Sequence, residues 1–112
     1  MSLANNFKQD ISNWDVSNVT NMKNMFSWAK SFNQNIGMWD VSKVTNMSEM
    51  LLEAISFNQD ISNWDVRRVT NMDSMFIEAR SFNQDISKWV VDNTANLSEM
   101  FELSPLRENI PK

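Results

Sequence analysis

The chain of 112 residues is long enough for one domain, and 42% of its residues are hydrophobic, as in an ordinary globular protein. Its net charge of −4, with no basic stripe, argues against nucleic acid as a partner. The absence of Cys and His excludes disulfides, thiolate chemistry, the usual zinc sites and histidine acid–base catalysis.

The sequence repeats with a period of 25 residues, which is typical of stacked repeat architectures. Phe7, Phe32, Phe57 and Phe82 mark four copies, and Ile, Trp, Val and Met recur at fixed distances after each of them. We therefore divide the chain into a remnant or partial N-terminal edge at residues 1–6, repeats at 7–31, 32–56, 57–81 and 82–106, and a C-terminal tail at 107–112.

The first half of each repeat predicts a short strand. In the third copy, Trp64 and Val66 flank Asp65, and an alternation of apolar and polar residues with aromatic and β-branched side chains favours a β-strand. We expect Trp64 and Val66 to face the interior. If the strand were inverted, the aromatic column would be exposed and would suit glycan stacking.

The second half of each repeat predicts a helix of about two turns. Met72, Met75, Phe76 and Ala79 follow the i, i+3, i+4, i+7 spacing of one helix face. Thr or Asn precedes this face and suits an N-cap. A helix this short is unstable alone, so it would need packing against neighbouring repeats.

Asn, Asp and Ser dominate the connections between these elements and close turns by bonding to their own backbone. Asn33, Asn58 and Asn83 recur after the repeat Phe, and we expect them to form a hydrogen-bonded ladder from copy to copy. Trp28 has no aromatic counterpart in the other copies, so we expect an exposed contact there.

Together these elements predict an α/β repeat solenoid, similar to a leucine-rich repeat, with 25 residues in each coil. Short parallel strands would lie on one side, about 4.8 Å apart, and short helices on the other. One repeat cannot bury its apolar face alone, so stacking of several copies would form the core.

The unit FNQDISNWDVSNVTNM, followed by a Met-Phe pair, resembles the 25-residue repeats of BspA-like bacterial leucine-rich-repeat surface proteins and mycoplasma lipoproteins. The resemblance covers residues 7–101 in four copies. It implies a location on the cell surface and a role in adhesion or host-protein binding. No basic-then-apolar leader is visible at the start of the sequence, and no apolar run reaches the length of a membrane span.

The polar side of the predicted strands is the candidate ligand face, because extended faces of repeat arrays are often binding surfaces. This face varies between copies while the core positions do not. A merely solvated face is the alternative. The candidate residues are Asn13, Asp15, Met38, Asp40, Asn63, Asp65, Arg67, Lys88 and Asp92.

Two metal sites are conceivable, but a structural role is favoured for each. A column of Asp15, Asp40 and Asp65 could hold calcium, although each Asp is better explained as a turn-closing acceptor. Met pairs such as Met22 and Met25 could bind Cu(I), although their spacing on an apolar face indicates core packing. We therefore predict no catalytic, cofactor-binding or metal-binding residues.

The sequence thus predicts a non-enzymatic surface module that binds an extracellular protein or glycan. The alternative is a structural spacer of a surface lipoprotein with no ligand of its own. An enzyme is disfavoured because every carboxylate in the motif has near-copies, whereas catalysis needs one asymmetric constellation. Self-association through open ends of the array is a further prediction.

Overall fold

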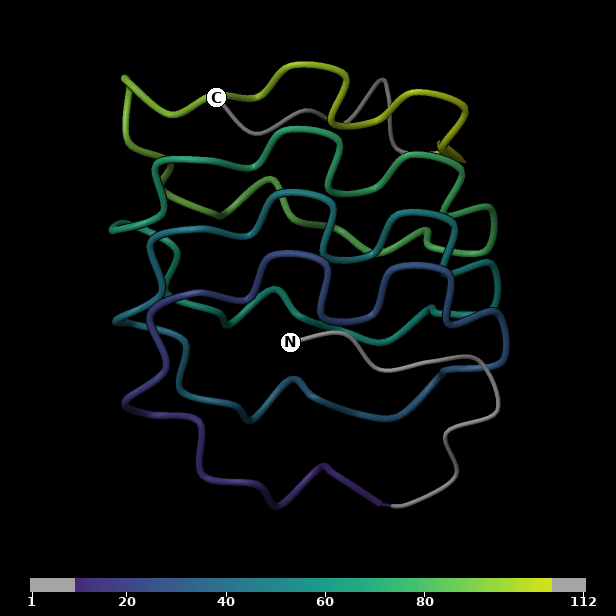
Figure 1. The fold of residues 1–112 in the computed structure, drawn as a ribbon, viewed down its shortest axis with the longest axis horizontal. Coiled ribbons are helices and arrows are strands. Elements are labelled where there is room, and N and C mark those ends of the chain that lie inside the picture. The colour runs from purple at the N-terminus through teal and green to yellow at the C-terminus, as the bar shows by residue number, and fades with distance from the viewer. Residues whose placement is uncertain (1–9, 106–112) are drawn as a thin grey trace.

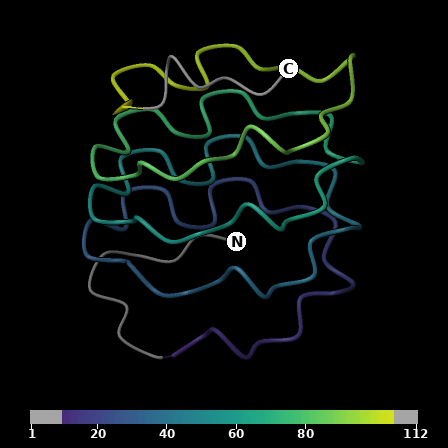
Figure 2. The same cartoon turned by 180° about the vertical axis from the view of Figure 1, so that it is seen from behind.

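Successive repeats lie one over another in the computed structural model, which describes residues 10–105 (Figure 1). The described coils comprise residues 10–31, 32–56, 57–81 and 82–105. Figure 2 shows the same stacking from behind, so the register is kept on both sides of the molecule. The predicted edge at residues 1–6 and the predicted tail at 107–112 lie outside the described residues.

The predicted α/β solenoid is wrong. Residues 10–105 contain no α-helix and no strand of more than one residue, and their helical content is confined to a 3₁₀ turn at Pro105. Among these described residues, parallel pairing occurs only as isolated bridges that link Asn21, Asn46, Asn71 and Asn96. The coils are therefore built from turns, and neither a sheet nor a layer of helices forms.

A ribbon of overlapping turns replaces the predicted helix. In the first coil, the N–H groups of Met25, Ser27 and Ala29 donate to carbonyls three residues earlier, at 3.1–3.2 Å. Two residues of this segment, Asn24 and Trp28, have φ of 62° and 67°, in the left-handed region. An α-helix cannot pass through such residues. We call this segment and its equivalents the turn ribbon: residues 22–29, 47–54, 72–79 and 97–104.

Hydrogen bonds between the turn ribbons join the coils. The N–H groups of every second residue point to the next coil, as when Met22 donates to Asn46 and Asn24 to Ser48. Twelve such bonds of 2.7–3.1 Å lead from the first three ribbons to the next coil: nine end within the next ribbon, and three end on the Asn that precedes it. The intervening N–H groups close the turns within each coil. Backbone groups of a buried segment must find partners, and this alternation provides them without a helix or sheet.

The segment predicted as a strand consists of two turns joined by a short extended stretch. Trp14 N–H donates to Ile11 at 3.0 Å, and Val19 N–H donates to Val16 at 2.9 Å. No backbone ladder joins this side of the described coils. Instead, the indole N–H groups donate to carbonyls of the preceding coil: Trp39 to Ile11, Trp64 to Ile36 and Trp89 to Ile61, at 3.0–3.1 Å.

The predicted core positions are confirmed. Trp64 is 3% exposed, while Val66, Met72, Met75 and Phe76 are equally buried. The Trp and Val side chains of the segment predicted as a strand therefore face the interior, as expected. Aromatic rings stack in columns along the coils. The Phe32–Phe57 and Phe57–Phe82 centroids are 5.6 Å and 5.7 Å apart, and the Trp64–Trp89 centroids are 6.3 Å apart. Such pairs add to the burial of apolar area.

Two smaller predictions are also confirmed. Asn58 N–H donates to the Asn33 side-chain oxygen at 2.8 Å, and Asn83 N–H donates to that of Asn58 at 2.9 Å, so the asparagine ladder exists. Gln side chains of the following position reinforce it, as when Gln59 donates to Asn33 at 3.0 Å. Trp28 is 53% exposed, as expected for an aromatic residue outside the core register.

Gly37 lies where the backbones of the second and third coils approach each other closely. The sister copies have Ser at this position, at residues 12, 62 and 87. A Cβ atom on Gly37, however, would collide with the backbone carbonyl of Asp60. The absence of a side chain therefore follows from local packing, although the repeat pattern alone makes Gly37 look like a casual substitution for Ser.

The Trp64→Ala variant should lose about 3–5 kcal/mol of unfolding free energy, because it removes a buried ring and an inter-coil hydrogen bond. Chemical denaturation would measure the loss. Trp28→Ala is the matched control, because this exposed ring should contribute less than about 1 kcal/mol. Equal losses for the two variants would contradict the burial of the Trp column.

The Gly37→Ser variant should be destabilised by about 1–3 kcal/mol, although Ser is the usual residue of the repeat. The cost comes from the Cβ atom, so Gly37→Ala should be destabilised to a similar extent. Thermal melts of both variants provide the comparison. A Gly37→Ser protein more stable than the parent chain would show that the second and third coils have room for a side chain.

Candidate functional site

The residues of the candidate ligand face lie at the surface of the described chain. This face lies on the side of the stack opposite to the turn ribbons, where the chain alternates between buried Trp or Val and outward polar side chains. The face is built by short turns, and not by the strands expected from the alternation. The predicted residues Asn13, Asp15, Met38, Asp40, Asn63, Arg67 and Lys88 are exposed, and Asp65 and Asp92 are partly exposed.

The acidic residues of this face close turns, which confirms the structural interpretation of the Asp column. The Asp15 carboxylate accepts the backbone N–H of Ser17 at 3.0 Å and its hydroxyl at 2.6 Å. Asp40 accepts the same two bonds from Ser42. These bonds hold the pKa of both carboxyl groups below the ordinary value. The residues therefore remain charged at neutral pH.

Asp65 and Arg67 form the best-defined polar pair on the face. The Arg67 guanidinium donates from Nε and from a terminal nitrogen to the two Asp65 oxygens, each at 2.9 Å. The Arg67 backbone N–H adds a third bond at 3.2 Å. Side-chain and then backbone hydrogen bonds from Arg67 lower the pKa of Asp65 to about 2. The Arg67 side chain is 70% exposed, so this pair is solvated.

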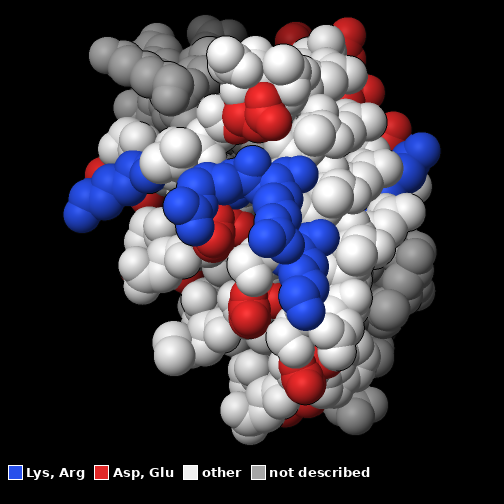
Figure 3. All heavy atoms as spheres, turned by 90° about the vertical axis from the view of Figure 1, so that its left-hand side faces the viewer, with Lys and Arg blue, Asp and Glu red and all other residues white. Residues whose placement is uncertain are grey.

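Sequence reasoning missed two basic residues, Lys43 and Arg68. Figure 3 shows Lys and Arg side chains gathered on one face of the molecule, between acidic groups. Lys43 Nζ donates to the Asn18 side chain in the first coil at 3.1 Å, and Arg68 helps to line a hollow beside Arg67. The sequence contained a signal for them. Lys43 and Arg68 occupy the same position in the second and third repeats, where the first and fourth repeats have the neutral residues Asn18 and Asn93.

Two shallow hollows meet at Arg67. One has a volume of about 490 Å³ and is lined by Ser42, Asp65, Arg67 and Arg68. The second, of about 290 Å³, shares Asp65 and Arg67 and extends to Lys88 and Val90 in the fourth coil. Charged and hydroxyl groups of three coils therefore line two hollows that share Asp65 and Arg67.

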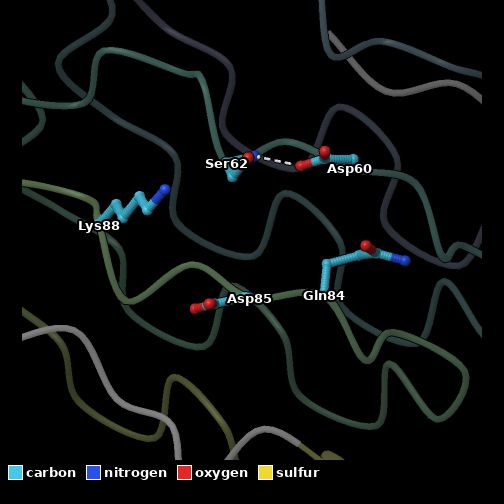
Figure 4. Close-up of a pocket in the computed structure, with 5 residues that line it drawn as sticks. All are labelled: Asp60, Ser62, Gln84, Asp85 and Lys88. Atoms are coloured by element: carbon cyan, nitrogen blue, oxygen red, sulfur yellow. Dashed lines mark hydrogen bonds between the residues drawn. The ribbon is translucent and has the colours of Figure 1, made fainter.

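A third, smaller hollow of about 130 Å³ lies between the third and fourth coils. Figure 4 shows Ser62 and Asp60 along one side of it and Asp85 and Gln84 along the other, with Lys88 at one end. Both carboxylates close turns, because Asp60 accepts from Ser62 N–H and Asp85 from Ser87 N–H, each at 2.9 Å. Lys88 thus lines two of the hollows and connects them.

The described residues also bear on copper binding by Met pairs, on metal binding by carboxylates and on membrane-spanning helices. Met22 and Met25 are buried in the core, at 1% and 2% exposure, as core packing requires. Within residues 10–105, no three acidic side chains converge as a metal-binding group. Over the same residues, no helix is long and apolar enough to cross a bilayer.

Comparison with protein families places the chain in a family without an assigned function. The model of a family described as "Mycoplasma protein of unknown function, DUF285" matches residues 1–111. Comparison with curated proteins and with solved structures gave no significant match.

Acidification should destabilise the fold. The turn-closing carboxyl groups have a lower pKa in the folded chain than the value of about 3.9 expected after unfolding. Their contribution is therefore complete above about pH 4 and is lost as the pH falls through the folded pKa, which is about 2 for Asp65. Melting temperatures between pH 7 and pH 2 would measure this loss.

Asp65→Asn is the control for this titration. Asn35 closes the equivalent kind of turn by accepting Gly37 N–H at 3.0 Å, so an Asn side chain can keep the turn. The variant should lose less stability than the parent chain between pH 4 and pH 2. A melting temperature that stays constant or rises below pH 4 would contradict the role of the carboxylates.

Proposed function

The chain belongs to the Mycoplasma protein family of unknown function DUF285, and from this premise we propose that it is a non-enzymatic binding module of the bacterial cell surface. Its ligand is an extracellular protein or glycan, and the contact surface is the candidate ligand face. The resemblance of the repeats to BspA-like bacterial surface proteins supports the location and the adhesive role.

One observation carries the proposal: the exposed positions of the candidate ligand face vary between repeats, whereas the core positions do not. The core positions repeat the same Ile, Trp, Val and Met residues in buried columns. By contrast, the position that contains Ser17 and Ser42 in the first two coils contains Arg67 in the third, and the position of Asn13 and Asn63 contains Met38 and Lys88. A constant scaffold with a varied surface is how repeat arrays acquire specificity.

The exposed apolar side chains point in the same direction. Met38 is 87% exposed and Val90 is 64% exposed, and both lie on the candidate ligand face where the sister copies have polar residues or Lys. An apolar side chain gains nothing from solvation, so its presence on a polar face is more useful for contact than for solubility. The spacer alternative offers no reason for these replacements.

The Asp40→Asn, Asp65→Asn and Arg67→Ser triple variant should test the proposal. Its replacements match residues found at comparable turns in the chain, so the melting temperature should stay close to that of the parent. A ligand that the parent binds on an array of matrix proteins and glycans should bind the variant about tenfold more weakly, the equivalent of about 1.4 kcal/mol.

A control with the same change in charge is available on the turn-ribbon side. Lys23→Ser, Glu99→Gln and Glu102→Gln remove one positive and two negative charges from exposed positions outside the face. This control should bind as the parent does. Equal losses for both triple variants would contradict the assignment of the face, and the absence of any ligand on the array would favour the spacer alternative.

A further inference from the structure

Four basic side chains form a cluster on a chain whose net charge is negative. We call Lys43, Arg67, Arg68 and Lys88 the basic cluster. They come from the second, third and fourth coils. Arg67, Arg68 and Lys88 line the two hollows that meet at Arg67, and Lys43 follows Ser42, which lines the first of them. Figure 3 shows the resulting basic area on an otherwise mixed surface. The chain as a whole has 14 acidic and 10 basic residues, so this concentration is local.

Three of the four cations are available for an external anion. Within residues 10–105, the ion pairs are Arg67 with Asp65 and Arg80 with Glu78. Lys43, Arg68 and Lys88 therefore have no carboxylate within salt-bridge distance among the described residues. Asp65 is already engaged by Arg67, because its two oxygens accept the two guanidinium bonds. Besides the larger effect of serine hydrogen bonds, Lys43 lowers the pKa of Asp40 at longer range and Lys88 lowers that of Asp85, so these cations are partly balanced by carboxylates but are not held in a direct ion pair.

The arrangement of the cluster favours an extended ligand over a single small anion. Lys43 and Arg68 occupy the same position in successive repeats, so they follow one another along the stacking direction. Arg67 and Lys88 continue the basic area across the second hollow into the fourth coil. Cations distributed over three coils match a linear chain that carries an anionic group at several places along its length.

The lining of the hollows favours a glycan over a protein segment. Ser42, Asp65 and the arginines present hydroxyl, carboxylate and guanidinium groups, which can hydrogen-bond to sugar hydroxyls as well as to anions. Protein partners usually insert an aromatic or aliphatic anchor into a desolvated apolar pocket. Neither hollow offers such a pocket, because Trp64 is 3% exposed and Val90 projects from the surface at 64% exposure.

We propose that the basic cluster binds a linear anionic polysaccharide through its sulfate or carboxylate groups. The proposal rests on the binding function assigned above and names the chemical class of its ligand. Arg67 and Arg68 supply fork-shaped donors that suit both kinds of anion, and Lys43 and Lys88 supply point charges at the two ends of the cluster.

Binding of immobilised dextran sulfate and carboxymethyl dextran would test the proposal, with neutral dextran and poly-glutamate as comparisons. The parent chain should bind one or both anionic dextrans and should not bind neutral dextran. The stronger of the two identifies the anionic group. Binding should weaken when NaCl rises from about 0.05 M to about 0.5 M, because exposed charges are screened at high salt.

The Lys43→Asn and Arg68→Asn double variant should bind the anionic dextran about tenfold more weakly. Asn is the residue at these positions in the first and fourth repeats, so the fold should tolerate both changes. Lys23→Ser with Lys30→Ser is the matched control, because it removes two exposed positive charges elsewhere and leaves the net charge equal to that of the double variant. The affinity of the control for the anionic dextran should differ from that of the parent by less than about twofold.

Three outcomes would overturn the proposal. Equal losses for the double variant and its control would show attraction to overall charge and no defined site. Tighter binding of poly-glutamate than of either anionic dextran would identify an acidic protein segment as the ligand. Failure of both dextrans, with another array ligand still sensitive to the Asp40, Asp65 and Arg67 variant, would remove the polysaccharide and leave the proposed function standing.

Discussion

The backbone hydrogen bonds between successive turn ribbons are the interaction on which the rest of the structure depends. They hold residues such as Glu53, Ser74 and Glu78 at positive φ, a conformation that costs non-glycine residues about 1–2 kcal/mol each. No single coil could maintain this geometry, because half of the ribbon N–H groups have their partners in the next coil. Stability is therefore a property of neighbouring coils, as in other repeat architectures.

The same register organises the interior and the opposite side. Once the ribbons fix the coils in place, equivalent Phe and Trp rings meet at 5.6–6.3 Å, and each buried indole N–H reaches a carbonyl of the preceding coil. Buried Trp requires a partner for its N–H group, and only the stacked neighbour supplies one. Ring stacking, indole bonding and the asparagine ladder thus all repeat along one direction.

This construction separates the stability of the chain from its surface chemistry. The carboxylates of Asp15, Asp40 and Asp65 are used in their own turns, so the outward atoms of neighbouring positions are free to change without loss of the fold. The replacement of Ser by Arg67 adds a bidentate contact to Asp65 and a basic group beside the hollows. Recognition by this family member would therefore depend on a few substitutions on a repeated scaffold.

The sequence by itself determined which residues are buried and which polar residues close turns. The 25-residue period aligned Ile, Trp, Val, Met and Phe into columns, and the alternation around Asp65 placed polar groups outside, because burial of apolar side chains follows periodicity directly. It also marked most of the candidate ligand face, since polar residues alternate there with the buried Trp and Val positions.

Only the tertiary structure decided the backbone path and the composition of the basic cluster. The spacing of Met72, Met75 and Phe76 is compatible with a helix, but bonds to the next coil select overlapping turns, and no Gly or Pro signals this choice. The basic cluster likewise could be recognised only in the structure, because the turns decide that Lys43 and Arg68 lie on the same side of the molecule as Lys88. Hydrogen bonds between successive coils determine the backbone path and the orientation of these side chains, and local propensity does not contain such bonds.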